Sequence, residues 1–285
     1  MARFLARLIE IQAPWARPLG DFNKRWLSRI LRRLGPVKDL LHGRWLGHPL
    51  HSATTDVPVG ALTVSIVLDL LDLRPAADIA LVIGVLFMIV SALAGAADYA
   101  DTDGSALMEA TVHSTLMVLS LLAYLASLAI RAGDPADRWA AIALSLVGYA
   151  LVVAGAYVGG RVVFALGNMV SRHVFGPRGG RWIALDLDTA IELADGVPVR
   201  ARAGVESLLI VRQGATIHAL HEKCAHAGGP LSEGRLVDGC IECPWHGSRF
   251  RLADGRAQRG PTVYDQPRYE IRLVDEGWEA RRIPN

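Results

Sequence analysis

The sequence predicts a multi-domain protein in which an all-α transmembrane four-helix bundle is followed by an all-β domain. Hydrophobic residues make up 52% of the 285 residues, and they concentrate between about 53 and 170. After about residue 178 the chain has ordinary charge, and short apolar runs alternate with Gly, Asp and Pro. Its three cysteines, Cys224, Cys240 and Cys243, lie close together. A clustered, odd-numbered set predicts a metal site in a reducing compartment rather than a disulfide framework.

The N-terminal segment, residues 1–52, carries ten basic residues. Apolar and aromatic residues interleave with them at the spacing of one helix face. This pattern predicts a basic amphipathic cytoplasmic segment that lies on an anionic membrane surface. The alternative is a solvated helix that packs on the protein itself.

Four apolar spans follow, near 53–72, 76–97, 106–130 and 139–160. Each approaches the ~20 residues that cross a bilayer core. Short polar linkers separate the spans, and the spans lack the polar stripe of soluble helices. We therefore predict a four-helix transmembrane domain over 53–160, a linker over 161–180 and the β domain over 181–285.

The basic residues predict the orientation of these spans. With four spans, the N-terminal segment and the C-terminal domain lie on the same side, called side one here. Side one carries the ten N-terminal basic residues together with Arg161, Arg172, Arg178 and Arg181. Side two carries Arg74, Arg131 and Arg138. The excess predicts that side one is cytoplasmic, in a multi-pass protein of the bacterial inner (cytoplasmic) membrane.

Two short motifs supply the residues for a metal centre. CAHAGGPL contains Cys224 and His226, and CPWHGSRF contains Cys243 and His246. Two Cys and two His can hold one tetrahedral zinc. They can also hold a [2Fe–2S] cluster in which two His replace two Cys on one iron. Zinc sites usually separate the Cys pair from the His pair, so these mixed motifs favour the cluster.

The two motifs, with the following DGR and the GP at 260–261, resemble the Rieske iron–sulfur family. This resemblance implies that Cys224 and Cys243 bind one iron and that His226 and His246 bind the other. Respiratory-complex members carry an additional disulfide, and Gly229 and Trp245 occupy the matching positions here. The domain therefore resembles the ferredoxin type.

Three neighbouring residues have secondary roles in this interpretation. Trp245 is expected to shield the cluster from water, or simply to pack. Ser248 is expected to donate a hydrogen bond toward a cluster sulfur, or to cap a turn. Cys240 is expected to be a small buried hydrophobe rather than a ligand. Only residues 247–285 follow His246, so we expect no oxygenase catalytic domain.

The membrane half resembles the DUF2231 family of prokaryotic four-helix membrane domains through HPLH and the spans over about 45–160. Its ionisable and polar side chains gather toward side one: His48, His51, Asp56, Asp98, Tyr99, Asp101, Asp103, Glu109 and His113. Such groups at membrane depth are usually functional or paired. One interpretation is that His113, with His48 or His51, ligates a haem b. A quinone or proton site, and mutual pairing without a ligand, are the alternatives.

The expected function is one-electron transfer by an oxidoreductase component that is anchored in the lipid bilayer. The expected partners are a redox protein or quinone, and no nucleic acid. A redox-sensing or assembly subunit is one alternative. The other is a membrane oxidoreductase whose helices bind haem b or quinone.

Overall fold

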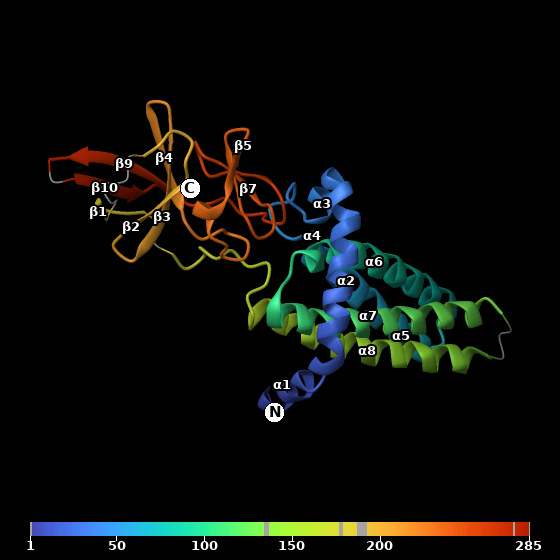
Figure 1. Ribbon diagram of the computed structural model, residues 1–285. Coiled ribbons are helices and arrows are strands. Elements are labelled where there is room, and N and C mark those ends of the chain that lie inside the picture. The colour runs from blue at the N-terminus through green and yellow to red at the C-terminus, as the bar shows by residue number, and fades with distance from the viewer. Residues whose placement is uncertain (1, 134–136, 177–178, 187–192, 276, 285) are drawn as a thin grey trace. The chain divides into compact units, whose positions relative to one another are not determined.

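The computed structural model describes residues 2–133, 137–176, 179–186, 193–275 and 277–284. Arg178, which contributes to the predicted orientation, lies outside these residues. The chain divides into two compact units, Met1–Asn168 and Met169–Asn285 (Figure 1). The predicted fold class is confirmed: long apolar helices form the first unit, and strands form the second.

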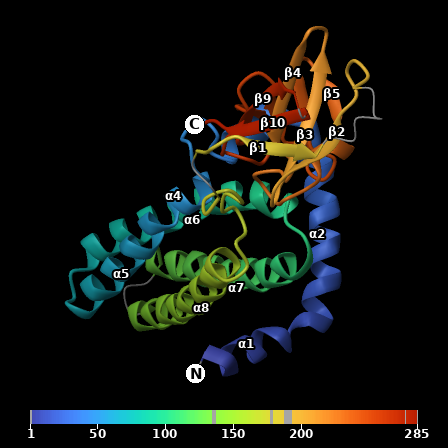
Figure 2. The same cartoon turned by 90° about the vertical axis from the view of Figure 1, so that its left-hand side faces the viewer.

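The helices of the first unit have the following bounds: α1 Ala2–Glu10, α2 Ala13–Arg33, α3 Gly35–Leu41, α4 Leu50–Thr54, α5 Asp56–Leu70, α6 Arg74–Ala100, α7 Gly104–Arg131 and α8 Arg138–Phe164. Four spans among the described residues are long and apolar enough to cross a membrane: Leu50–Leu70 and helices α6, α7 and α8. Helix α5 pairs with α6, and α7 pairs with α8 (Figure 2).

Two helix ends differ by a few residues from the approximate predicted spans. The first span begins at Leu50, within the predicted N-terminal segment, because Pro49 precedes a first helical turn there. Helix α8 continues to Phe164, into the predicted linker. Within this helix the Arg161 guanidinium binds both carboxylate oxygens of Glu109 on α7, at 3.1 and 2.9 Å.

Helix α2 runs across the spans rather than along them, as both views show (Figures 1 and 2). Gly20 allows the close approach, because a Cβ atom there would lie 2.6 Å from Thr111 Oγ1. Lys24 pairs with Asp103, and Ser28 Oγ donates to the Ala100 carbonyl at 3.2 Å. These contacts lie at the side-one ends of α6 and α7.

The opposite face of α1 and α2 is an apolar stripe, and its members recur every three or four residues. All are exposed: Phe4, Leu8, Ile11, Trp15, Leu19, Phe22, Trp26 and Ile30. The N-terminal segment therefore packs on the bundle with one face and presents a hydrophobic stripe with the other.

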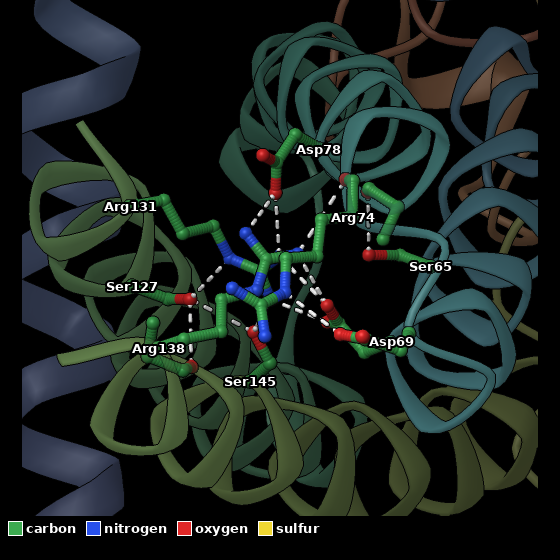
Figure 3. Close-up of polar contacts among 11 residues, drawn as sticks. Ser65, Asp69, Arg74, Asp78, Ser127, Arg131, Arg138 and Ser145 are labelled. Carbon is green, nitrogen blue, oxygen red and sulfur yellow. Dashed lines mark hydrogen bonds and ion pairs between the residues drawn. The ribbon is translucent and has the colours of Figure 1, made fainter. Parts of the chain in front are cut away.

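A cluster of two arginines and two aspartates joins the helices at side two (Figure 3). Arg131 binds Asp69 at 2.5 Å and Asp78 at 2.7 Å, and Arg138 binds the same two carboxylates at 2.5 and 2.7 Å. The side chains of Asp69 and Arg131 are 1% and 2% exposed. Because the four residues come from α5, α6, α7 and α8, the cluster ties all four spans together.

The second unit contains a closed barrel in the strand order β1-β10-β9-β4-β3-β2 and a smaller sheet in the order β5-β6-β7-β8. The barrel strands are β1 Ile183–Asp186, β2 Val199–Ala203, β3 Glu206–Gln213, β4 Thr216–His221, β9 Arg268–Val274 and β10 Gly277–Arg282. The smaller sheet contains β5 Arg235–Val237, β6 Cys240–Glu242, β7 Arg249–Arg251 and β8 Ala257–Arg259, and a 3₁₀ turn, Leu231–Glu233, precedes it. All neighbouring strands pair antiparallel.

Candidate metal centre

Two loops of similar construction carry the predicted ligands. The first follows β4 and contains Cys224 and His226, and the second joins β6 to β7 and contains Cys243 and His246. In the first, Cys224 N donates to Gly229 O at 2.9 Å, and Gly228 N donates to Cys224 O at 2.8 Å.

The second loop repeats this pattern at the same offsets. Cys243 N donates to Ser248 O at 2.8 Å, and Gly247 N donates to Cys243 O at 3.1 Å. Gly228 and Gly247 have φ of +82° and +73°, a conformation that glycine adopts without steric cost. The glycine four residues after each cysteine lies within both motifs and is therefore a sequence signal in addition to the ligands.

The four side chains form two pairs. The thiols of Cys224 and Cys243 hydrogen-bond to each other, and both are at least 97% buried. This contact raises the pKa of Cys224 and lowers that of Cys243 to about 7. The imidazole rings of His226 and His246 form the other pair, with centroids 5.0 Å apart. His226 is buried and His246 is partly exposed.

The cysteines also belong to an apolar core that includes Leu220, Ile241 and Phe250. The predicted buried position of Cys240 agrees with its 8% exposure.

Gly229 and Trp245 lie side by side. A Cβ atom at Gly229 would approach Cys243 Sγ to 2.9 Å and the Trp245 ring to 3.0 Å. The indole therefore covers this side of Cys243, although 56% of Trp245 is exposed.

Ser248 is fully buried, and its Oγ has no hydrogen-bond partner within the part of the chain that the structure describes. A buried hydroxyl without a partner costs roughly 1–3 kcal/mol, so a further acceptor beside it is expected.

The residues present fit a [2Fe–2S] cluster of the Cys₂His₂ kind. Two adjacent thiols suit one iron and a separate imidazole pair suits the other. The orphaned Ser248 hydroxyl suits a sulfur acceptor. A cluster of this kind supplies one-electron oxidation and reduction.

Sequence reasoning missed Gln266, which fastens the first loop. Its Oε1 accepts from Ala225 N at 2.9 Å, and its Nε2 donates to the carbonyls of His221 and Lys223 at 2.6 and 2.7 Å. Gln266 is fully buried. It lies forty-odd residues from its partners, so no local motif includes it.

The turn behind the loops explains the DGR and GP motifs. Gly260 has φ +93°, and a Cβ atom there would lie 2.6 Å from Ser248 Cα. Gly255 has φ +72° and would collide with the Gln266 carbonyl at 2.1 Å. Gly260 is therefore required for the close approach of backbone to the second loop, and Gly255 for its approach to Gln266, which holds the first.

In the membrane unit the structure brings together two of the three predicted histidines. The ring centroids of His51 and His113 are 6.1 Å apart. His48 is exposed, and its recorded contact is with Pro49 O at 3.4 Å.

The structure also pairs most of the side-one carboxylates, with partners outside the predicted set. A residue missed by sequence reasoning, His42, is fully buried between Asp98, at 3.0 Å, and Asp101, at 3.1 Å. Burial lowers the pKa of His42, but hydrogen bonds to Asp101 and Asp98 outweigh it and raise the pKa above the ordinary value. Asp101 also binds Lys38 at 2.7 Å.

This donor set and the apolar helices define an iron–sulfur protein with a membrane domain. Residues 182–270 match the Rieske [2Fe-2S] domain, and residues 47–172 match a family described as predicted membrane protein (DUF2231). The chain belongs to the Rieske [2Fe–2S] family, with a DUF2231 membrane domain in its N-terminal half.

Three similar proteins each cover between 30% and 38% of this chain. The chain is 33% identical over 84 residues to the anthranilate 1,2-dioxygenase ferredoxin subunit of Burkholderia cepacia, covering 30% of this chain and 78% of the relative. It is 31% identical over 85 residues to apoptosis-inducing factor 3 of Homo sapiens, covering 30% of this chain but only 14% of that protein. The ferredoxin of carbazole 1,9a-dioxygenase from Nocardioides aromaticivorans IC177 is 27% identical, with a TM-score of 0.30, covering 38% of this chain and 100% of the ferredoxin.

Proposed function

We propose that this protein is a membrane-anchored Rieske protein that carries out one-electron transfer at the cytoplasmic face of the bacterial inner membrane. The observation that carries the proposal is the pairing of the four ligands in two matched loops. Cys224 and Cys243 hold one iron as thiolates, and His226 and His246 hold the other through neutral imidazoles. Sequence relatives that are named as ferredoxin subunits support the same role.

The residues around the ligands set the properties of the site. Ser248 donates its hydroxyl proton toward a cluster sulfur and so raises the reduction potential. Trp245 limits water beside Cys243. Because both thiols are buried and His246 is partly exposed, the imidazole edge gives a partner the shorter path.

The proposed partners are a soluble redox protein on one side of the reaction and a membrane acceptor, such as quinone, on the other. Lipid anchoring is attributed to the four spans and to the α1–α2 stripe. Basic residues beside this stripe favour an anionic leaflet. The cytoplasmic orientation is supported by the excess of basic residues on side one.

Sealed membrane vesicles of both orientations test the function and the orientation together. We expect a membrane-impermeant reductant to reduce the cluster in inside-out vesicles and not in right-side-out vesicles. After the reductant is removed, we expect added quinone or a membrane extract to reoxidise it. The matched control is Cys243→Ser, which keeps the membrane domain and lacks one iron ligand.

Two results would contradict the proposal. Reduction only in right-side-out vesicles would overturn the orientation. A cluster that is reduced but never reoxidised by quinone or membranes would instead support the redox-sensing alternative.

A further inference from the structure

The membrane domain contains two histidines that are held in the same way by two different helices. His51, on α4, has its Nδ1 2.8 Å from the carbonyl of Ser91 on α6. His113, on α7, has its Nδ1 2.8 Å from the carbonyl of Gly155 on α8. Because a carbonyl only accepts, each Nδ1 carries the proton, and each Nε2 keeps its lone pair.

A glycine makes room for each ring. It stands four residues after the carbonyl, at Gly95 for His51 and at Gly159 for His113. A Cβ atom would lie 2.9 Å from His51 Nδ1 in the first case and 3.0 Å from the His113 ring in the second. The spacing of Ser91 with Gly95 and of Gly155 with Gly159 is thus explained by imidazole packing.

His51 is the second residue of the first span, but its ring contacts α6 at Ser91, nine residues before the last residue of that helix. His113 is nine residues from the first residue of α7, and Gly155 is nine residues from the last residue of α8. At 1.5 Å per residue this is about 13 Å along each helix. An apolar core about 30 Å thick has no water to satisfy a lone pair at that depth. Among the described residues, neither Nε2 has a recorded hydrogen-bond partner.

The geometry favours a ligand between the rings. A metal about 2 Å from each Nε2 places two opposed imidazole centroids about 6 Å apart. The observed distance is 6.1 Å, with the ring planes at 79°. Rotation about a metal–nitrogen bond leaves the interplanar angle unrestricted, so this angle suits axial ligation.

The number of donors selects the kind of ligand. A zinc ion takes three or four protein donors. In the described part of the membrane domain, no group of three or more His, Cys, Asp or Glu side chains converges on a metal position. A haem brings four nitrogens of its own and leaves two axial positions.

We propose that His51 and His113 are the two axial ligands of a haem b bound within the membrane domain. The proposal does not depend on the role assigned to the Rieske domain, because it rests on the membrane helices alone. It also gives a role to the two Nε2 atoms, for which no hydrogen-bond partner is recorded among the described residues.

Full-length protein, produced with ample haem precursor and purified in detergent, provides the test. We expect one haem per chain by the pyridine haemochrome assay and a six-coordinate, low-spin spectrum. His51→Ala and His113→Ala are each expected to lower haem content about tenfold or more, or to give a five-coordinate spectrum. His48→Ala is the matched control and is expected to keep full haem content.

A second variant separates loss of ligation from loss of fold. In His113→Gln the side-chain amide can still donate to Gly155 O but is a poor iron ligand, so the fold should persist without haem. Acid-labile sulfide, measured in every variant, reports an intact Rieske domain independently. Full sulfide with no haem in the unsubstituted protein would overturn the proposal, as would haem that persists unchanged in both alanine variants.

Discussion

Replacing Gln266 with leucine tests how the first cluster loop is held. Gln266→Leu preserves size and removes three hydrogen bonds, to Ala225 N, His221 O and Lys223 O. Lys223 O keeps a second contact with His173 Nε2 at 2.8 Å. The two groups left without this partner are therefore Ala225 N and His221 O. A buried polar group left without a partner costs roughly 1–3 kcal/mol, which predicts a loss of about 2–6 kcal/mol for the two.

The measurement is the unfolding of the Rieske domain by denaturant in the full-length protein. The visible circular dichroism of the domain monitors the unfolding. The rate of iron loss to a chelator is measured in parallel, because a looser loop should release the ligands sooner. Gln258→Leu is the matched control, since Gln258 is exposed and its single recorded contact is 3.4 Å long. Equal stability and equal iron loss in the two variants would refute the role assigned to Gln266.

Three further predictions concern the cluster, the side-two ion pairs and the side-one histidine. Ser248→Ala should lower the reduction potential in a redox titration, because a hydrogen bond to sulfur stabilises the reduced form; an unchanged potential would contradict this. Arg131→Met should destabilise the membrane domain by up to about 3–5 kcal/mol, since it leaves Arg138 as the one arginine for both carboxylates, whereas Arg74→Met at an exposed pair should cost about 0–1 kcal/mol. Thermal unfolding in detergent compares the two variants. Equal losses of stability would show that the ion pairs of Arg131 do not hold the four spans together. Because the folded pKa of His42 is raised, its stabilisation is complete below about pH 6.5 and is lost as pH rises through the folded pKa. The midpoint of thermal unfolding should therefore fall as the pH rises through the folded pKa of His42. In His42→Gln the midpoint should depend less on pH.

The spans and the ligand motifs could be predicted because their signals are local. Continuous apolar composition indicates a span whatever surrounds it, and the four structural spans agree with the prediction. The four predicted ligands lie in two short motifs, so residues close together in the sequence identify them: Cys224, His226, Cys243 and His246. The span ends were less predictable from local sequence. At the end of α8, for example, Arg161 is paired with Glu109 on another helix, and this contact is not visible in the sequence.

The residues that sequence reasoning missed act over long sequence separations. Gln266 reaches back 41 residues to Ala225, and His42 reaches 56 residues forward to Asp98. Neither position has a spacing that distinguishes it from an ordinary polar residue. Among the three predicted membrane histidines, only the tertiary packing on Ser91 and Gly155 distinguishes His51 and His113 from His48.

The ion pairs strengthen the argument for the proposed orientation. Each basic residue of side two is bound to an aspartate, with Arg131 and Arg138 on Asp69 and Asp78 inside the bundle and Arg74 on Asp72. On side one, by contrast, the described arginines at 7, 17, 25, 29, 32 and 33 have no recorded carboxylate partner, and they flank the exposed apolar stripe of α1 and α2. Positive charge without a recorded carboxylate partner is therefore concentrated beside the exposed apolar stripe of α1 and α2. Since anionic lipids attract such segments at about 1 kcal/mol per basic residue, this concentration favours contact with the cytoplasmic leaflet, where those lipids are enriched.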